Sequence, residues 1–167
     1  EGYDSLYAPA ASFLTGEVNA HELICNTVGR PIFVNTLFSC LAGLAGAGQN
    51  CSFQPLWQPR FIDVLAAEDR CHLNGVALLD GEPTWATACS DGNTATSWRL
   101  NRQSGGVLIN IPNQEIIARG LSMPHSPRWH AGKIWLLNSG TGQLGWIDQE
   151  KFTPLCSLPG FVRGLAF

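Results

Sequence analysis

The stretch HELICNTVGRPIFVNT (residues 21–36) begins with a histidine, passes through an apolar run to a glycine, and then reaches an aromatic residue before a polar pair. The same order recurs in HLNGVALLDGEPTWATA (residues 72–88) and HSPRWHAGKIWLLNS (residues 125–139). The glycines of the three copies are 52 and 51 residues apart, at Gly29, Gly81 and Gly132. Periods of about 40 to 50 residues are typical of four-stranded β-propeller blades. The sequence therefore predicts an all-β fold, a partial β-propeller with three to four blades of a larger propeller.

Short runs of β-forming residues alternate with turn sequences along the chain, as this fold requires. Asp80-Gly81 and Ala131-Gly132 stand between such runs and predict hairpin turns, and Pro112-Asn113 predicts another. One segment, PRFIDVLAAED (residues 59–69), has apolar residues at i, i+1, i+4 and i+5 and predicts one short helix. Side chains at equivalent positions of the copies are predicted to fill the space between blades, namely Phe33, Val76, Trp85, Trp135 and Leu136.

The length of the chain suits one domain. A chain of 167 residues can bury a sizeable core, and no linker or low-complexity tract divides it. It starts at Glu1 and ends within the run FVRGLAF (residues 161–167), which resembles an innermost blade strand. Because a propeller typically needs at least four blades to close, residues 1–167 are expected to be a single propeller-like domain from a longer chain. Unpaired strand edges would then make the isolated piece associate.

Charge and cysteine usage limit the classes of partner and the compartment. The net charge is −3 and no cluster of Lys or Arg occurs, so neither nucleic acid nor a membrane surface is an expected partner. The longest uncharged stretch of small residues, 37–48, is too short to span a bilayer. Six cysteines without a Cys-x-x-Cys pair favour buried free thiols in a reducing compartment, and hence a cytoplasmic location.

Three histidines occupy equivalent places in the copies, at His21, His72 and His125. On neighbouring blades these side chains would converge near the propeller axis. Converging imidazoles are suited to a divalent metal, because histidine is the commonest metal ligand. Alternatively, each histidine caps a strand by hydrogen bonding. The sequence alone leaves both interpretations open, and no cofactor other than this metal is predicted.

The segment PHSPRWH (residues 124–130) is the densest group of polar and aromatic residues in the chain. Its two prolines stiffen the segment and hold His125, Arg128, Trp129 and His130 at fixed orientations, as a ligand site or a rigid blade junction would require. Arginine forks to oxygen pairs and tryptophan stacks on flat groups, which favours an anionic or sugar-like ligand. The candidate ligand-binding residues at this channel mouth are His72, Asn74, His125, Arg128, Trp129 and His130.

Four long motifs carry a resemblance to a known family. They are EDRCHLNG (residues 68–75), GLSMPHSPRWH (120–130), WLLNSG (135–140) and LPGFVRG (158–164). With them the chain resembles a bacterial family of conserved hypothetical proteins, classed as a domain of unknown function and regarded as propeller-like. Members of that family are roughly twice this length, which agrees with a piece of a longer chain. The resemblance implies no established activity and no catalytic residues.

Two functions of different class follow from these observations. The first is a non-catalytic binding module that holds a small polar ligand or a protein loop at the channel mouth. The alternative is a metal-assisted hydrolase or lactonase-like enzyme that uses the same histidines with Glu68 or Asp69. The sequence contains neither a Gly-x-Ser-x-Gly nucleophile motif nor a phosphate-binding loop, and a purely structural role is the third interpretation.

Overall fold

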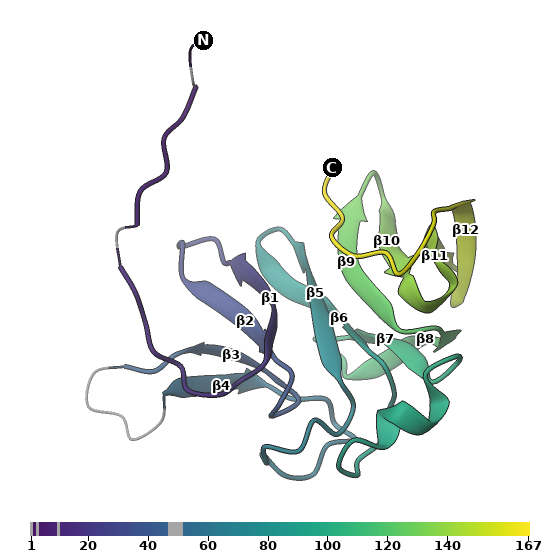
Figure 1. The fold of residues 1–167 in the computed structure, drawn as a ribbon, viewed down its shortest axis with the longest axis horizontal. Helices are drawn as coiled ribbons and strands as arrows, with labels where there is room; N and C mark the ends of the chain where they lie inside the picture. The colour runs from purple at the N-terminus through teal and green to yellow at the C-terminus, as the bar shows by residue number, and fades with distance from the viewer. Residues whose placement is uncertain (1, 3, 10, 47–51) are drawn as a thin grey trace.

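The computed structural model describes residues 2, 4–9, 11–46 and 52–167, and it shows an all-β molecule (Figure 1). The described residues contain twelve strands, which form three four-stranded antiparallel sheets. Sheet 1 contains β1 (Ala20–Cys25), β2 (Pro31–Asn35), β3 (Cys40–Leu44) and β4 (Phe53–Trp57). Sheet 2 contains β5 (Leu73–Leu79), β6 (Glu82–Ala88), β7 (Gly106–Asn110) and β8 (Glu115–Leu121). Sheet 3 contains β9 (Pro124–His130), β10 (Lys133–Asn138), β11 (Gln143–Asp148) and β12 (Lys151–Ser157).

Each sheet is a meander whose strands pair in chain order. The turn between the first and second strands contains a glycine in the left-handed region, with φ of 74° at Gly29, 81° at Gly81 and 78° at Gly132. Only glycine adopts this region without a steric cost, which explains its place in these hairpins. The hairpins predicted at Asp80-Gly81 and Ala131-Gly132 are therefore present, and Pro112-Asn113 lies in the turn between β7 and β8.

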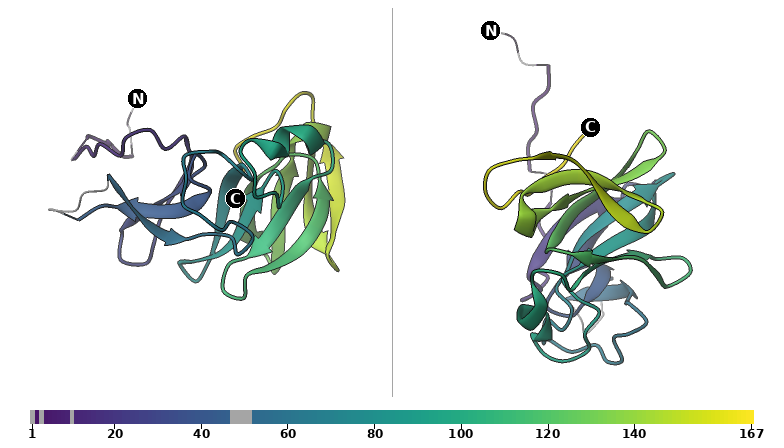
Figure 2. Two further views of the ribbon diagram at one scale, coloured as in Figure 1. Left: turned by 90° about the horizontal axis from the view of Figure 1, so that it is seen from below. Right: turned by 90° about the vertical axis from the view of Figure 1, so that its right-hand side faces the viewer.

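The first strands of the three sheets, β1, β5 and β9, lie side by side, and the later strands fan outward from them (Figures 1 and 2). Gly75 of β5 makes this close approach feasible. A Cβ atom there would lie 2.5 Å from the Pro127 ring of β9 and 2.5 Å from the Thr87 hydroxyl. We refer to β1, β5 and β9 below as the inner strands.

Apolar side chains fill the spaces between sheets. Val34 and Leu41 of sheet 1 pack with Val76 of sheet 2, and Trp85 of sheet 2 packs with Leu136 of sheet 3. A third cluster around Phe33 covers the face of sheet 1 that points away from sheet 2. Four of the five predicted core residues are buried; Trp135, the fifth, is only half-buried against Trp146 and Phe167 on the outward face of sheet 3.

The prediction of a helix over residues 59–69 is wrong. These residues form an irregular connection between β4 and β5, and the described part of the chain contains only two short 3-10 helices, η1 (Ser97–Asn101) and η2 (Ser139–Thr141). The backbone N–H groups of Glu68 and Asp69 both donate to the carbonyl of Leu37 instead of to a helical partner. A short apolar periodicity is a weak signal when tertiary hydrogen bonds compete for the same backbone groups.

The final segment also differs from the prediction of an innermost strand. Residues 158–167, all of them described, contain no strand. Gly160 and Gly164 have φ of 86° and 77°, which interrupts an extended backbone. The Leu158 N–H donates to the Gly142 carbonyl, and the segment then crosses toward the inner strands as a tail (Figure 1).

The prediction that the cysteines are buried free thiols is confirmed for some of them. Cys40, Cys71 and Cys89 are buried free thiols, whereas Cys25 and Cys156 are exposed, and Cys51 lies outside the described residues. Burial raises the pKa of the Cys40 thiol to about 12, so this thiol is unreactive at neutral pH.

The uncharged stretch of small residues, 37–48, contributes β3, and its end lies outside the described residues. No helix in the described residues is long and apolar enough to cross a membrane.

Candidate functional site

A polar cleft of about 440 Å³ opens where the inner strands approach the C-terminal tail. Its walls come from all three sheets, so no single sheet could form it. The lining residues are Ala20, His21, Glu22, Asn74, His125, Ser126, Arg128, Arg163 and Gly164. We call this cavity the polar cleft.

β-bulges in the inner strands explain why consecutive side chains line the same cleft. Side chains of a regular strand alternate between its two faces. In β9, His125 pairs with Leu137 and Arg128 with Trp135, so two residues of β9 oppose one residue of β10. Ser126 sits in this bulge with φ of 52°, and the register of β1 shifts in the same way between Ala20 and Leu23. A bulge changes the direction in which side chains point, and here it makes polar side chains that are neighbours in the sequence point toward the same cavity.

The Glu22 carboxylate ties the three inner strands together. One of its oxygens lies 2.5 Å from the Arg128 guanidinium of β9. The other accepts the backbone N–H of Val76 in β5 at 2.8 Å. Glu22 is largely shielded from solvent, which makes both interactions stronger than at an open surface. Arg128, predicted as a ligand contact, thus has a partner within the protein.

The three histidines of the sequence copies meet beside the cleft. The ring of His21 lies edge-on to that of His72, with centroids 4.8 Å apart, and its centroid is 6.0 Å from that of His125. His21 and His125 line the cleft, whereas His72 is not among its lining residues. The predicted convergence of these side chains is therefore present in the structure.

Hydrogen bonds determine which ring nitrogen carries the proton. Nδ1 of His125 lies 2.9 Å from the carbonyl of Met123, an acceptor, and therefore donates. Nδ1 of His72 donates to the Asp69 carboxylate at 3.0 Å. The Thr36 hydroxyl donates to the Leu73 carbonyl at 2.5 Å, so it accepts from Nδ1 of His21 at 2.9 Å.

In a neutral imidazole the nitrogen that carries no proton is a hydrogen-bond acceptor. Within the described part of the chain, no hydrogen bond occupies Nε2 of His21, His72 or His125. Burial, supported by the nearby charge of Arg163, lowers the pKa of both His21 and His125 to about 4. These two rings are therefore neutral at physiological pH and offer acceptors rather than positive charge.

Arg163 supplies the positive charge of the cleft. It lies on the exposed tail, which the Gly164 N–H anchors by donating to the Ser126 hydroxyl at 3.1 Å. No ion pair of Arg163 occurs among the described residues. Sequence reasoning missed Arg163 because residues 161–167 were assigned to a strand, and missed Glu22 although it directly follows the first repeated histidine.

Three other predicted site residues have different surroundings. Asn74 lines the cleft, but its side chain is engaged by the Thr87 hydroxyl and by the thiol of Cys89. Trp129 stacks on Trp85 with ring centroids 5.1 Å apart. His130 stacks on Phe167 at 4.1 Å, and neither Trp129 nor His130 lines the cleft.

The carboxylates proposed for acid–base chemistry are held by structural partners. Asp69 is buried and accepts from both His72 and the indole N–H of Trp98. Glu68 pairs with Arg70. In the described ranges, no group of three His, Cys, Asp or Glu side chains is arranged to hold a metal ion, so a metal at His21, His72 and His125 stays a prediction.

A comparison with models of protein families identifies the family of the chain. A family model described as Domain of unknown function (DUF4915) matches residues 1–167. No curated protein matches the chain. The predicted resemblance to a family of unknown function is confirmed at this level.

The first prediction concerns Glu22. The substitution Glu22→Gln removes the charge that faces Arg128 and should lower the free energy of unfolding by about 1–3 kcal/mol, because the arginine is left partly shielded without its counter-charge. Urea unfolding would measure the change. The matched control is Asp91→Asn in the exposed pair with Arg119, which should cost less than about 1 kcal/mol. Equal effects of the two changes would show that Glu22 does not tie the inner strands.

The second prediction concerns pH. In the unfolded chain His21 and His125 titrate near pH 6.5, whereas in the fold they titrate near 4. The unfolded state therefore binds more protons between these values, and stability should fall as the pH is lowered from 6.5. Urea unfolding between pH 5 and 6.5 would measure the slope, and His125→Asn should reduce it relative to the unsubstituted protein. An identical slope in both proteins would contradict the prediction.

Proposed function

This chain belongs to the family Domain of unknown function (DUF4915), and we propose from the geometry of its polar cleft that it is a binding module for a small polar anion. The single observation that carries the proposal is Arg163. Arg163 lines a polar cleft and has no ion pair among the described residues. A guanidinium binds carboxylate or phosphate oxygens with two parallel hydrogen bonds, and an anion is the ligand it favours.

We propose further that the three sheets are blades of a propeller, with the inner strands nearest its axis. Three features support this interpretation. Each sheet is a four-stranded meander, the glycine hairpins recur at nearly equal spacing, and the inner strands face one another. The polar cleft would then lie at one mouth of the central channel, where propellers have room for a ligand.

The two neutral histidines complement Arg163. Each offers an Nε2 acceptor, which pairs with a hydroxyl group but repels the oxygens of an anion. A ligand that satisfies the cleft therefore has an anionic group for Arg163 and hydroxyl donors for His21 and His125. The Ser126 hydroxyl, which also lines the cleft, can accept or donate.

The engagement of Asp69 and Glu68 favours binding over hydrolysis. A general base must reach the reacting group, directly or through one water. Asp69 is buried, accepts from His72 and Trp98, and does not line the cleft, and Glu68 pairs with Arg70. Glu22 does line the cleft, but its two oxygens already hold Arg128 and the Val76 N–H. The cleft is better suited to holding a ligand than to moving its protons.

The third prediction tests anion binding. Titration of the protein with glycerate, which carries a carboxylate and two hydroxyls, should shift the NMR signals of residues around the cleft. Arg163→Gln should weaken this binding roughly tenfold or more, because one charge-assisted, two-pronged contact is lost.

The matched control is Arg102→Gln, which removes the same charge from an exposed arginine outside the lining of the cleft. It should leave the affinity for glycerate unchanged. Equal losses of affinity for glycerate in the two variants would mean that only the overall charge of the protein matters. Signal shifts confined to other surfaces would show that the polar cleft is not the binding site. Absence of any binding by glycerate or inorganic phosphate would overturn the function.

A metal-assisted hydrolase is the second candidate, and the tautomers of the histidines favour it. Histidines that bind metals usually donate their other N–H to a carboxylate, a carbonyl or a similar oxygen. His72 and His125 donate Nδ1–H in this way to Asp69 and Met123, and His21 to Thr36. The rings would need to turn to bring three Nε2 atoms onto one ion, because the described residues offer no ready three-ligand group.

The fourth prediction separates the two candidates. After equilibration with Zn²⁺ and exhaustive dialysis, we expect no stoichiometric zinc in the protein by elemental analysis. One zinc per chain that is lost in His72→Ala/His125→Ala and retained in His130→Ala would contradict this expectation and favour the hydrolase. His130 is a suitable control because it does not line the cleft.

A further inference from the structure

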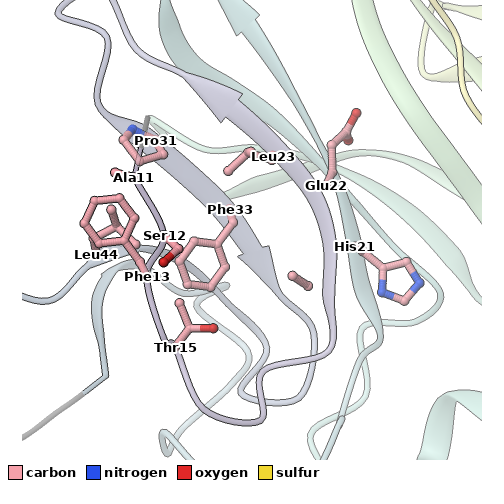
Figure 3. Close-up of a pocket in the computed structure, with 11 residues that line it drawn as sticks. Ala11, Ser12, Phe13, Thr15, His21, Glu22, Leu23, Pro31, Phe33 and Leu44 are labelled. Carbon is pink, nitrogen blue, oxygen red and sulfur yellow. The ribbon is translucent and has the colours of Figure 1, made fainter. Parts of the chain in front are cut away.

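A second cavity, of about 390 Å³, lies on the other side of β1 between the N-terminal segment and sheet 1 (Figure 3). Its walls are mainly apolar, and we call it the apolar groove. The apolar side chains that line it are Ala11, Phe13, Leu23, Pro31, Phe33 and Leu44. Figure 3 shows the rings of Phe13 and Phe33 on one side of β1 and the side chains of His21 and Glu22 toward the other.

The apolar groove and the polar cleft share three lining residues, Ala20, His21 and Glu22. All three belong to β1, which is the edge strand of sheet 1 and, in the described part of the chain, pairs with β2 alone. The two sides of sheet 1 therefore meet at the free edge of β1. An elongated molecule lying across this edge would touch both cavities at once.

The two cavities differ sharply in the chemistry they offer. The polar cleft has an arginine without an ion pair in the described residues, whereas Glu22, the charged residue shared with the groove, is neutralised by Arg128. Two large side chains of the groove, Leu23 and Phe13, are 65% and 64% exposed. Exposed apolar surface beside a concave wall favours a hydrocarbon partner.

We propose that the ligand is an amphiphilic anion with a medium-length hydrocarbon chain. Its polar end lies in the polar cleft, with the anionic group against Arg163 and hydroxyl donors toward His21 and His125, and its chain crosses the edge of β1 into the apolar groove. This proposal rests on the proposed binding function and adds the class of ligand to it. Charge complementarity selects the occupant: the positive charge lies at one end of the combined site, so the ligand carries its charge at one end.

The chain-length dependence of binding follows from the groove. Full burial of one methylene group corresponds to about a fourfold gain in affinity. The groove is open on one side, so about half of this free energy, a twofold gain per methylene, is expected. Octanoate has four methylenes more than butanoate and should bind about 16-fold more tightly.

NMR titration of the purified protein with butanoate and with octanoate tests this inference. Both should depend on Arg163, and octanoate should also shift signals along the apolar groove. The double variant Phe13→Ser/Leu23→Ser should bind butanoate as before and lose the roughly 16-fold advantage of octanoate. Both substituted side chains are largely exposed, so the fold should tolerate the change. Leu155→Ser, a change at a 58% exposed position of β12, is the matched control and should keep the advantage.

Three outcomes would overturn the inference, and they separate it from the proposed function. If butanoate and octanoate bind equally well and both depend on Arg163, the anion site is supported, but the proposal that the ligand carries a hydrocarbon chain is wrong. An advantage of octanoate that survives in the double variant would place the chain elsewhere. Binding of octanoate that does not depend on Arg163 would overturn both the inference and the anion site, and would make the groove a site for apolar groups alone.

Discussion

The contact between Glu22 and its two partners is the constraint on which the site depends. The carboxylate reaches from β1 to the guanidinium of Arg128 in β9 and to the Val76 N–H in β5. The hairpins lie within single sheets, whereas this contact joins all three inner strands through one side chain. Gly75 permits the same approach sterically, because a Cβ there would collide with Pro127 and Thr87. The spacing of the inner strands, and hence the width of the polar cleft, follows from these two residues.

The properties of the cleft arise from irregularities in otherwise regular strands. In β1 and β9 a bulge breaks the alternation of side chains, so that His21 and Glu22, or His125 and Ser126, line one cavity. Burial then keeps His21 and His125 neutral, and the tail brings the charge of Arg163 to the rim. Neutral acceptors, one cation and an adjacent apolar groove together define the kind of ligand that the site would hold.

Much of the fold was predictable from residues whose roles are local. Gly81 and Gly132 marked hairpins, because a tight turn needs a backbone conformation that glycine adopts freely. The equivalent places of His21, His72 and His125 in the three copies predicted that these side chains would meet, as their rings do. The prediction of a helix over residues 59–69 was wrong because it relied on apolar spacing alone. In the structure the backbone N–H groups of Glu68 and Asp69 donate to the carbonyl of Leu37, which is distant in the sequence. Trp129 and His130 were predicted with the site because they are adjacent to it in the chain.

The sequence by itself determined the all-β class, the positions of the hairpins and the equivalence of three histidines, since each depends on residues close together in the chain. Tertiary structure alone decided which polar groups are satisfied and which face a ligand. Arg128 is paired because Glu22 lies across from it on another sheet, whereas the tail brings Arg163 to the cleft without an ion pair among the described residues. Hydrogen bonding and desolvation depend on neighbours in space, and no local pattern of residues records those neighbours.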